Sequence, residues 1–499
     1  MGQQDRNGGG GSERGMDRRS FLGGVAALGV ASGIAAHMGT VEAAAWSAKR
    51  KSGAAGKGGK LPARGEFVIR NAYVMTMDAA LGDIARGDVH VRNGEILAIG
   101  TDLKAPGVAI LDGRGMIVLP GLVETHWHMW NTLLRSMSGD KREHGYFPTA
   151  AALGKVFMPE DMYQGTRLAA TEAIHGGITS VHDWCHNIRS PQFAEENLRA
   201  LSESGIRARF SYGSPQGHPA NATIDLADLE RLHRDWKRYS HEGLLTLGLA
   251  WRGAYDDPKA MIPNEAARRE FDTARRLGMP ISIHVSNSHS RAGQIAVLAK
   301  ENLLGKDVQL IHAIWVTPEE LRSVAAAGSG VSFSPYTEMR IGFGFPHAGE
   351  FIAANIPIGL SIDTITLSGN ADMFAIMKAI QNIENGRSEN EFKLLPRRVL
   401  EMATIEGART MGIDDRVGSL RPGKRADVIM VSSRDVNMGP FTDPAHLLVE
   451  AAQPANVDTV VVDGRILKRH GKLTAIDTRR MMDEATISLT GVRKRAGWW

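Results

Sequence analysis

The chain has 499 residues, of which 43% are hydrophobic and 23% are charged, so it contains enough apolar material for a large core. Its formal net charge of +4 arises in the first 60 residues, which hold nine Lys or Arg and four Asp or Glu, and the remainder is close to neutral. This composition excludes collagen-like, disordered and multi-span membrane proteins, and it gives no electrostatic reason to expect a nucleic-acid partner.

The first 45 residues are typical of an export signal. The segment Met-Asp-Arg-Arg-Ser-Phe-Leu at 16–22 opens an apolar run rich in Gly and Ala, and Ala43-Ala44-Ala45 offers a cleavage site. The paired arginines resemble the twin-arginine export signal, which carries folded proteins. We therefore expect residues 1–45 to be a signal peptide and 46–64 a linker. The mature protein would be periplasmic or secreted, with membrane contact only during export; an N-terminal membrane anchor is the alternative.

Short β-strands separated by turns are predicted over residues 65–118. Apolar runs such as Phe67-Val68-Ile69 and Ala72-Tyr73-Val74-Met75 fit this pattern, and the Asn93-Gly94 pair is a strong hairpin signal. We expect this segment to form the N-terminal part of a small β-sandwich that flanks the next domain.

Strand and helix alternate eight times over residues 119–417. Short apolar runs separated by helical stretches indicate β/α units and a parallel sheet. Eight such units in about 300 residues favour a (β/α)8 TIM barrel, whose catalytic groups lie at the C-terminal ends of its strands. An open, doubly wound sheet is the alternative. The strands are expected at 121–126, 178–183, 207–213, 244–251, 281–285, 308–312, 330–335 and 357–363.

Short strands return over residues 418–475, for example at 426–431 and 457–462. We expect this segment to complete the β-sandwich, so that one small domain is built from both ends of the chain. The final segment, 476–499, contains the basic run Arg493-Lys494-Arg495 and is predicted to be a solvated tail.

Polar side chains end several of the predicted barrel strands. His126 and His128 are two residues apart at the end of the first strand, so they project to the same face. His284, His312 and Asp363 end the fifth, sixth and eighth strands. In a barrel these groups would meet at one mouth, where a shared cation satisfies buried imidazole and carboxylate groups. Zinc suits such ligands, and iron or manganese are alternatives.

The chain resembles the amidohydrolase superfamily, specifically its cytosine deaminase and triazine hydrolase (chlorohydrolase) branch of metal-dependent hydrolases. The resemblance rests on the segment 120–128, on the three later strand-end residues, and on Gly-Ser-Leu-Arg-Pro-Gly-Lys-Arg-Ala-Asp-Val at 418–428. It covers about residues 65–475 and implies a barrel that holds one divalent metal ion. No lysine ends the fourth strand, so the two-metal version of the family is not expected.

The resemblance also implies roles for individual residues. It makes His126, His128, His284 and Asp363 the metal ligands and His312 a catalytic histidine. Asp363 would accept a proton from the metal-activated water and pass it to the leaving group, while His312 stabilises the tetrahedral intermediate. The expected reaction is hydrolysis of a non-peptide carbon–nitrogen bond in a small molecule, an amide, urea, carbamate or cyclic amidine.

One position departs from the deaminases of this branch. They carry Glu three residues after the strand-five histidine, and this chain has Asn287 there. An amide cannot shuttle a proton, so we expect Asn287 only to bind substrate. Glu338 is a candidate replacement that would also reach the substrate, and a loop salt bridge is its alternative. Deamination or dechlorination of a purine, pyrimidine or triazine ring is the alternative reaction, and an inactive ligand-binding barrel is the non-enzyme alternative.

The end of the second strand is rich in polar and aromatic residues. His182, Trp184 and His186 are predicted to contact substrate, with a hydrogen-bonded structural role as the alternative for one of the histidines. Cys185 is the single cysteine, so no internal disulfide is expected, and it is predicted to be a packing residue. We expect the protein to be a homo-oligomer.

Overall fold

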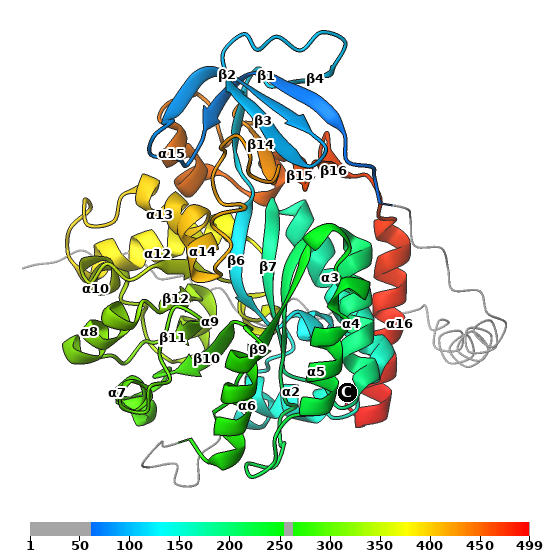
Figure 1. Cartoon of the computed structure of the whole chain (residues 1–499), viewed down its shortest axis with the longest axis vertical. Coiled ribbons are helices and arrows are strands. Elements are labelled where there is room, and N and C mark those ends of the chain that lie inside the picture. The colour runs from blue at the N-terminus through cyan, green and yellow to red at the C-terminus, as the bar shows by residue number, and fades with distance from the viewer. Residues whose placement is uncertain (1–60, 254–262, 499) are drawn as a thin grey trace, which may run out of the picture. The chain divides into compact units, whose positions relative to one another are not determined.

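A computed structural model describes residues 61–253 and 263–498 (Figure 1). The predicted signal peptide at 1–45 and most of the predicted linker at 46–64 lie outside the described residues. Within the described part of the chain, no helix is long and apolar enough to span a membrane.

Eight parallel strands close into a barrel, which confirms the (β/α)8 prediction. The last strand pairs with the first through Leu360 and Glu124, and this contact completes the ring. The strands are almost entirely buried, as expected for parallel strands that side chains cover on both faces. Each overlaps its predicted position. They are β6 (Leu122–Trp127), β7 (Ile178–Cys185), β8 (Arg207–Tyr212), β9 (Leu245–Ala250), β10 (Ile281–Val285), β11 (Val308–His312), β12 (Gly330–Phe333) and β13 (Ile358–Leu360).

Helices follow the barrel strands, and α8 shows how the sequence sets their ends. Thr317 caps its first turn by accepting from the Glu320 N–H, Pro318 occupies the first helical position, and Gly328 ends the helix with φ of +75°. The helices are α2 (Tyr146–Gly154), α3 (Pro159–His175), α4 (Pro191–Ser204), α5 (Leu226–Arg234), α6 (Glu265–Arg276), α7 (Gln294–Lys300), α8 (Pro318–Ala327), α9 (Pro335–Ile341), α10 (Ala348–Ala353), α11 (Ile365–Ser368), α12 (Met373–Arg387), α13 (Pro396–Met402) and α14 (Ile405–Thr410).

Both ends of the chain contribute to one flanking sheet, as predicted (Figure 1). All nine strands belong to a single hydrogen-bonded sheet instead of two separate sheets. The two chain ends join where β5 pairs with β14 in antiparallel orientation, and Asn93-Gly94 forms the predicted hairpin turn. The strands are β1 (Glu66–Met75), β2 (Asp83–Arg92), β3 (Glu95–Gly100), β4 (Ala109–Asp112), β5 (Met116–Pro120), β14 (Val428–Ser432), β15 (Val457–Val462), β16 (Arg465–Arg469) and β17 (Lys472–Leu473).

The prediction of a solvated tail at 476–499 is wrong, because this segment contains the helix α16 (Thr478–Ala496). The helix packs against α3, and Met481, Ala485, Ser488 and Val492 are buried on one face. Their spacing of four, three and four residues is that of one helical stripe. The basic run lies in the last turn, where positive charge is favourable near a helix C-terminus.

Candidate active site

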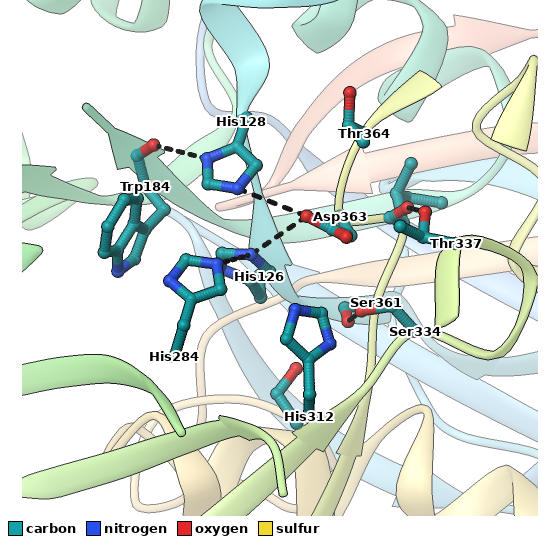
Figure 2. A network of polar contacts seen from close by, with 12 residues as sticks. His126, His128, Trp184, His284, His312, Ser334, Thr337, Ser361, Asp363 and Thr364 are labelled. Atoms are coloured by element: carbon teal, nitrogen blue, oxygen red, sulfur yellow. Dashed lines mark hydrogen bonds and ion pairs between the residues drawn. The ribbon is translucent and has the colours of Figure 1, made fainter. Parts of the chain in front are cut away.

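Three histidines and one aspartate meet at one mouth of the barrel (Figure 2). His126 lies in β6 and His128 just after it, His284 lies in β10, and Asp363 follows β13. The Nε2 atoms of His126 and His128 each lie 3.2 Å from Oδ1 of Asp363, and the Nε2 atoms of His126 and His284 are 3.2 Å apart. The potential ligand atoms of all four side chains lie within 4.8 Å of one another.

This group has the chemistry and spacing of a divalent metal site. Ligand atoms arranged tetrahedrally at about 2.0–2.1 Å from zinc lie about 3.3 Å from one another, close to the separations seen here. Burial lowers the pKa of His126 to about 3, and burial likewise lowers the pKa of His284. Both imidazoles are therefore neutral at physiological pH, which is the form that binds a metal ion. The residues present fit one divalent ion.

Backbone contacts hold the aspartate in place. The Asp363 N–H donates to the His126 carbonyl oxygen at 2.9 Å, and the His128 N–H donates to the Asp363 carbonyl oxygen at 2.7 Å. Asp363 has φ of +60° and His312 has φ of +72°, in the left-handed region that non-glycine residues seldom adopt. Such strain is typical of positions where function dictates the backbone conformation.

A buried carboxyl group below the site links the first and last barrel strands. Oε1 of Glu124 accepts hydrogen bonds from the N–H groups of His126, at 3.0 Å, and Ile362, at 3.1 Å. Burial raises the pKa of Glu124 to about 8. These bonds fix the backbone on both sides of the metal group, and sequence analysis missed the residue because it precedes the strand end.

His312 lies beside the metal group and is held by a second buried carboxylate. Its Nδ1–H donates to Oε1 of Glu338 at 3.0 Å, and the Ser334 N–H donates to the same oxygen at 2.8 Å. The carboxylate partner assigns the ring proton to Nδ1 and leaves Nε2 available. Glu338 lies in the first turn of α9, and burial raises its pKa.

The prediction that Glu338 contacts substrate is wrong. Its side chain has no solvent exposure and does not line the cavity at the metal group, whereas His312 does. The helix α9 places the carboxylate behind the imidazole, where it orients His312. The loop salt bridge considered from the sequence is thus a buried pair between a carboxylate and a histidine.

A cavity of about 420 Å³ opens onto the metal group. This volume suits a small molecule, and the aromatic side chains in its wall suit a planar one. Asn287, Trp184 and His186 line it as predicted, together with residues that sequence analysis did not select. These further lining residues are Tyr146, Phe147, Gln216, Trp251, Arg252, Gly253, Arg291, Ile341 and Phe343.

Two of the predicted lining residues also support the metal group. The Trp184 carbonyl oxygen accepts a hydrogen bond from His128 Nδ1 at 3.1 Å, which turns Nε2 of that histidine toward Asp363 (Figure 2). The Trp184 ring stands perpendicular to the His284 ring, with 4.4 Å between centroids. His186 accepts a hydrogen bond from the Trp130 indole N–H at 3.3 Å.

The prediction that His182 contacts substrate is wrong. Nδ1 lies 2.9 Å from the Thr125 carbonyl oxygen and Nε2 lies 2.8 Å from Ser211 Oγ, so both ring nitrogens have partners inside the barrel. The ring is fully buried and does not line the cavity. His182 and Trp184 are two residues apart and share one face of β7, and His182 lies earlier in the strand, in the barrel interior below the metal group.

Arg252 and Tyr146 are lining residues that differ in how far the sequence could reveal them. Arg252 lies two residues beyond β9, so the rule that barrel strands end at the site also applies to it. Tyr146 begins α2 far from any strand, and no pattern in the sequence distinguishes it.

Comparison with known proteins agrees with the barrel fold and the metal group described above. The model of the amidohydrolase family matches residues 117–467. A 5'-deoxyadenosine deaminase of Methanosarcina acetivorans is 30% identical over 86% of this chain and 99% of its own length. A 5-methylthioadenosine/S-adenosylhomocysteine deaminase of Carboxydothermus hydrogenoformans is 28% identical over 84% of this chain and 96% of its own length.

Two solved structures have the same fold. An adenosine deaminase from Xanthomonas campestris with bound zinc has a TM-score of 0.75 at 23% identity, over 87% of this chain and all of that one. An atrazine chlorohydrolase from Arthrobacter aurescens in complex with zinc has a TM-score of 0.75 at 23% identity, over 85% of this chain and all of that one.

Proposed function

The chain belongs to the amidohydrolase family and is a hydrolase acting on carbon–nitrogen bonds, and we propose that it removes an amino group from a planar nitrogen heterocycle. The observation that carries the proposal is the joint position of the metal group and the buried His312–Glu338 pair at one aromatic cavity. The deaminase relatives support the choice of a ring amine over the amides and ureas that the sequence first favoured.

We propose zinc as the metal ion, held by His126, His128, His284 and Asp363. Three imidazoles and one carboxylate without thiolate suit zinc, and two structural neighbours contain it. When bound, a zinc ion acidifies water and stabilises developing negative charge, so that hydrolysis proceeds at neutral pH.

Asp363 and His312 are proposed to move the protons. Asp363 accepts a proton from the attacking water and delivers it to the departing nitrogen, since its carboxylate lies at the reaction centre. Burial alone would raise the pKa of Asp363, but its contacts with the imidazoles of His126 and His128 hold it far below its usual range, so the carboxylate starts ionised.

The His312–Glu338 pair is proposed to serve the heterocycle itself. Water attack on a ring carbon pushes electrons onto the adjacent ring nitrogen, which then needs a proton or a hydrogen-bond donor. A protonated His312 supplies this through Nε2, and Glu338 stabilises the imidazolium from behind. Asn287 can accept or donate hydrogen bonds to the ring but cannot carry the proton.

Hydrolysis of an amide or urea is the second candidate, and Asn287 is the observation that favours it. An amide or urea already has a carbonyl oxygen to take the developing charge, so it needs no glutamate at this position. The same residues would perform this reaction.

The test is a screen of the zinc-loaded protein for ammonia release from aminopurines, aminopyrimidines, aminotriazines, amides and ureas. We expect a ring amine to respond and Asp363→Ala to abolish the signal. A response from amides or ureas alone would favour the second candidate. If chromatography detected no product from any of these compounds with protein that contains one zinc ion, the proposal would be wrong.

Two further expectations from the sequence are kept as proposals. Export rests on the twin-arginine-like segment, and a reporter fused to residues 1–60 that stayed in the cytoplasm would contradict it. Self-association into a homo-oligomer is testable by light scattering, where the mass of a single chain would contradict it.

A further inference from the structure

Arg252 brings a positive charge into the cavity, and the buried Glu270 acts on that charge through space without forming an ion pair with it. Its Nη1 donates to the Pro215 carbonyl oxygen at 3.2 Å, and it forms no ion pair with a carboxylate of the described residues. Burial lowers the pKa of Arg252 to about 10, so the guanidinium is still charged at neutral pH. A desolvated charge of this kind is unfavourable unless an opposite charge joins it.

A second arginine lines the same cavity from the segment that follows another barrel strand. Arg291 lies in the short helix η5 (His289–Arg291) beyond β10 and lines the cavity with Arg252. Burial is the largest cause of the lowered pKa of Arg252, and Tyr146 and Glu270 act against it. The charge of Arg291 lowers this pKa further, so the two cations repel each other. Two mutually repelling cations in one cavity wall are typical of a site that is completed by an anion.

The described lining residues offer little to balance this charge. Asp363 is the one acidic side chain among them, and it is engaged by His126 and His128 at the metal group. A divalent ion in that group would add further positive charge. The potential of the cavity therefore favours a negatively charged ligand.

We infer that the substrate carries an oxyanion, a carboxylate or a phosphate, which Arg252 and Arg291 bind while the reacting carbon lies at the metal group. A guanidinium binds either group through paired N–H donors, and this recognition is both strong and directional. The inference rests on the proposed function for the reacting end of the substrate. It adds that the opposite end is anionic.

The first experiment compares ring amines in matched sets that differ only in a carboxylate, a phosphate or a neutral amide substituent. We expect kcat/KM of the zinc-loaded full chain to be about 100-fold higher for one of the anionic members, as for truncation of a buried charge pair. Arg252→Gln should remove this preference, so that kcat/KM falls far more for the anionic member than for the neutral one. Arg291→Gln should reduce it less, because this side chain is exposed. The matched control is Arg322→Gln, at an exposed position of α8.

The outcomes separate a binding role from a role at the reacting atoms. If Arg252→Gln lowered kcat equally for charged and neutral members with KM unchanged, the arginine would act on the transition state and the inference would be wrong. If the wild type did not prefer either anionic member over the amide, it would also be wrong. The preferred member distinguishes a carboxylate from a phosphate.

A second experiment needs no turnover, so it separates failure of this inference from failure of the proposed function. Isonicotinate, isonicotinamide and inorganic phosphate are titrated by calorimetry into metal-free protein, which removes direct binding to zinc. We expect isonicotinate or phosphate to bind at least tenfold more tightly to the wild type than to Arg252→Gln, with isonicotinamide unaffected. Equal binding of all three probes to both proteins would overturn the inference, whatever the ammonia screen shows.

Discussion

Nδ1 of His312 lies 3.0 Å from Oε1 of Glu338, and both side chains are buried where the cavity meets the barrel. The chain thus keeps a carboxylate near the reaction centre although position 287 is asparagine. The carboxylate comes from α9 instead of from the segment after β10, and it reaches the cavity only through the imidazole. In the proposed reaction this pair therefore serves the ring nitrogen, while Asp363 serves the departing nitrogen.

Replacement of Glu338 should affect the chemical step more than substrate binding. Glu338→Gln keeps the shape of the side chain but removes the charge that stabilises an imidazolium at His312. We expect kcat to fall about 100-fold with KM changed less than about threefold. Steady-state kinetics on protein with verified metal content tests this, and a change confined to KM would show that Glu338 serves binding.

Replacement of Asn287 should give the opposite pattern. Asn287→Ala removes hydrogen bonds to the substrate from the cavity wall. We expect KM to rise about tenfold, as for loss of one neutral hydrogen bond, while kcat stays within about threefold. The two variants can be compared in one assay, and a large fall in kcat for Asn287→Ala would contradict the purely binding role.

Removal of the metal should abolish turnover reversibly. Dialysis against a chelator is expected to eliminate product formation, and addition of zinc should restore it, because the metal supplies the activated water. His284→Ala removes one of the four ligands and should retain less than one zinc ion per chain by elemental analysis. Full activity in chelated, metal-free protein would refute the metal site.

The buried carboxyl group of Asp183 predicts that the difference in stability between the wild type and Asp183→Asn depends on pH. The side chain is fully buried in β7, and burial raises its pKa to about 8 from an ordinary value near 3.8. As pH rises from about 4 to 8, the unfolded chain ionises this group while the folded chain keeps it neutral, so the wild type loses stability. Asp183→Asn carries no such proton.

The Asp183→Asn variant should therefore gain stability relative to the wild type as pH rises, by up to about 1.4 kcal/mol per pH unit over this range. Urea denaturation at pH 5 and pH 8 measures the difference. Asp235→Asn, at a more exposed position, serves as the control. A difference between wild type and Asp183→Asn that did not change between the two pH values would contradict the raised pKa.

Two adjacent methionines test the packing of α16. Met481 is 3% exposed against α3, whereas Met482 is 48% exposed. Met481→Ala should lower the free energy of unfolding by about 2–3 kcal/mol, the usual cost of a cavity left by a large side chain. Met482→Ala should change it by less than about 0.5 kcal/mol. Equal effects in chemical denaturation would mean that the helix does not dock.

The barrel and the metal group follow from the sequence for a simple physical reason. Apolar runs mark the strands, and parallel strands of a closed barrel bring their C-terminal ends to one mouth. The positions of His126, His284 and Asp363 at strand ends are therefore enough to predict that they meet. Local apolar patterns are enough to predict the strands, and the polar residues at the strand ends are enough to predict the metal group.

The remaining contacts depend on information that strand patterns do not contain. The carboxylate of Glu338 reaches His312 because it lies in the first turn of α9, directly after β12, and β12 is the neighbour of β11 in the barrel. Strand patterns do not specify the direction in which this helix starts. His182 lies one layer below the cavity because it precedes Trp184 by two residues on the same face of β7, deeper in the barrel. The spacing of Met481, Ala485 and Val492 indicates the helix α16, whereas the basic run at 493–495 fits both a solvated tail and the last turn of a helix.

The pairing of β5 with β14 links the folding of the flanking sheet to the order in which the chain is synthesised. Pro120 lies opposite Val428, so this pairing cannot form until the entire barrel segment between the two strands has been synthesised. Until then β1 to β5 have no partner for one edge, and an unpaired edge invites association with other chains. The flanking sheet is therefore completed only after the barrel segment has been synthesised, and until then the open edge of β5 has to be kept from other chains.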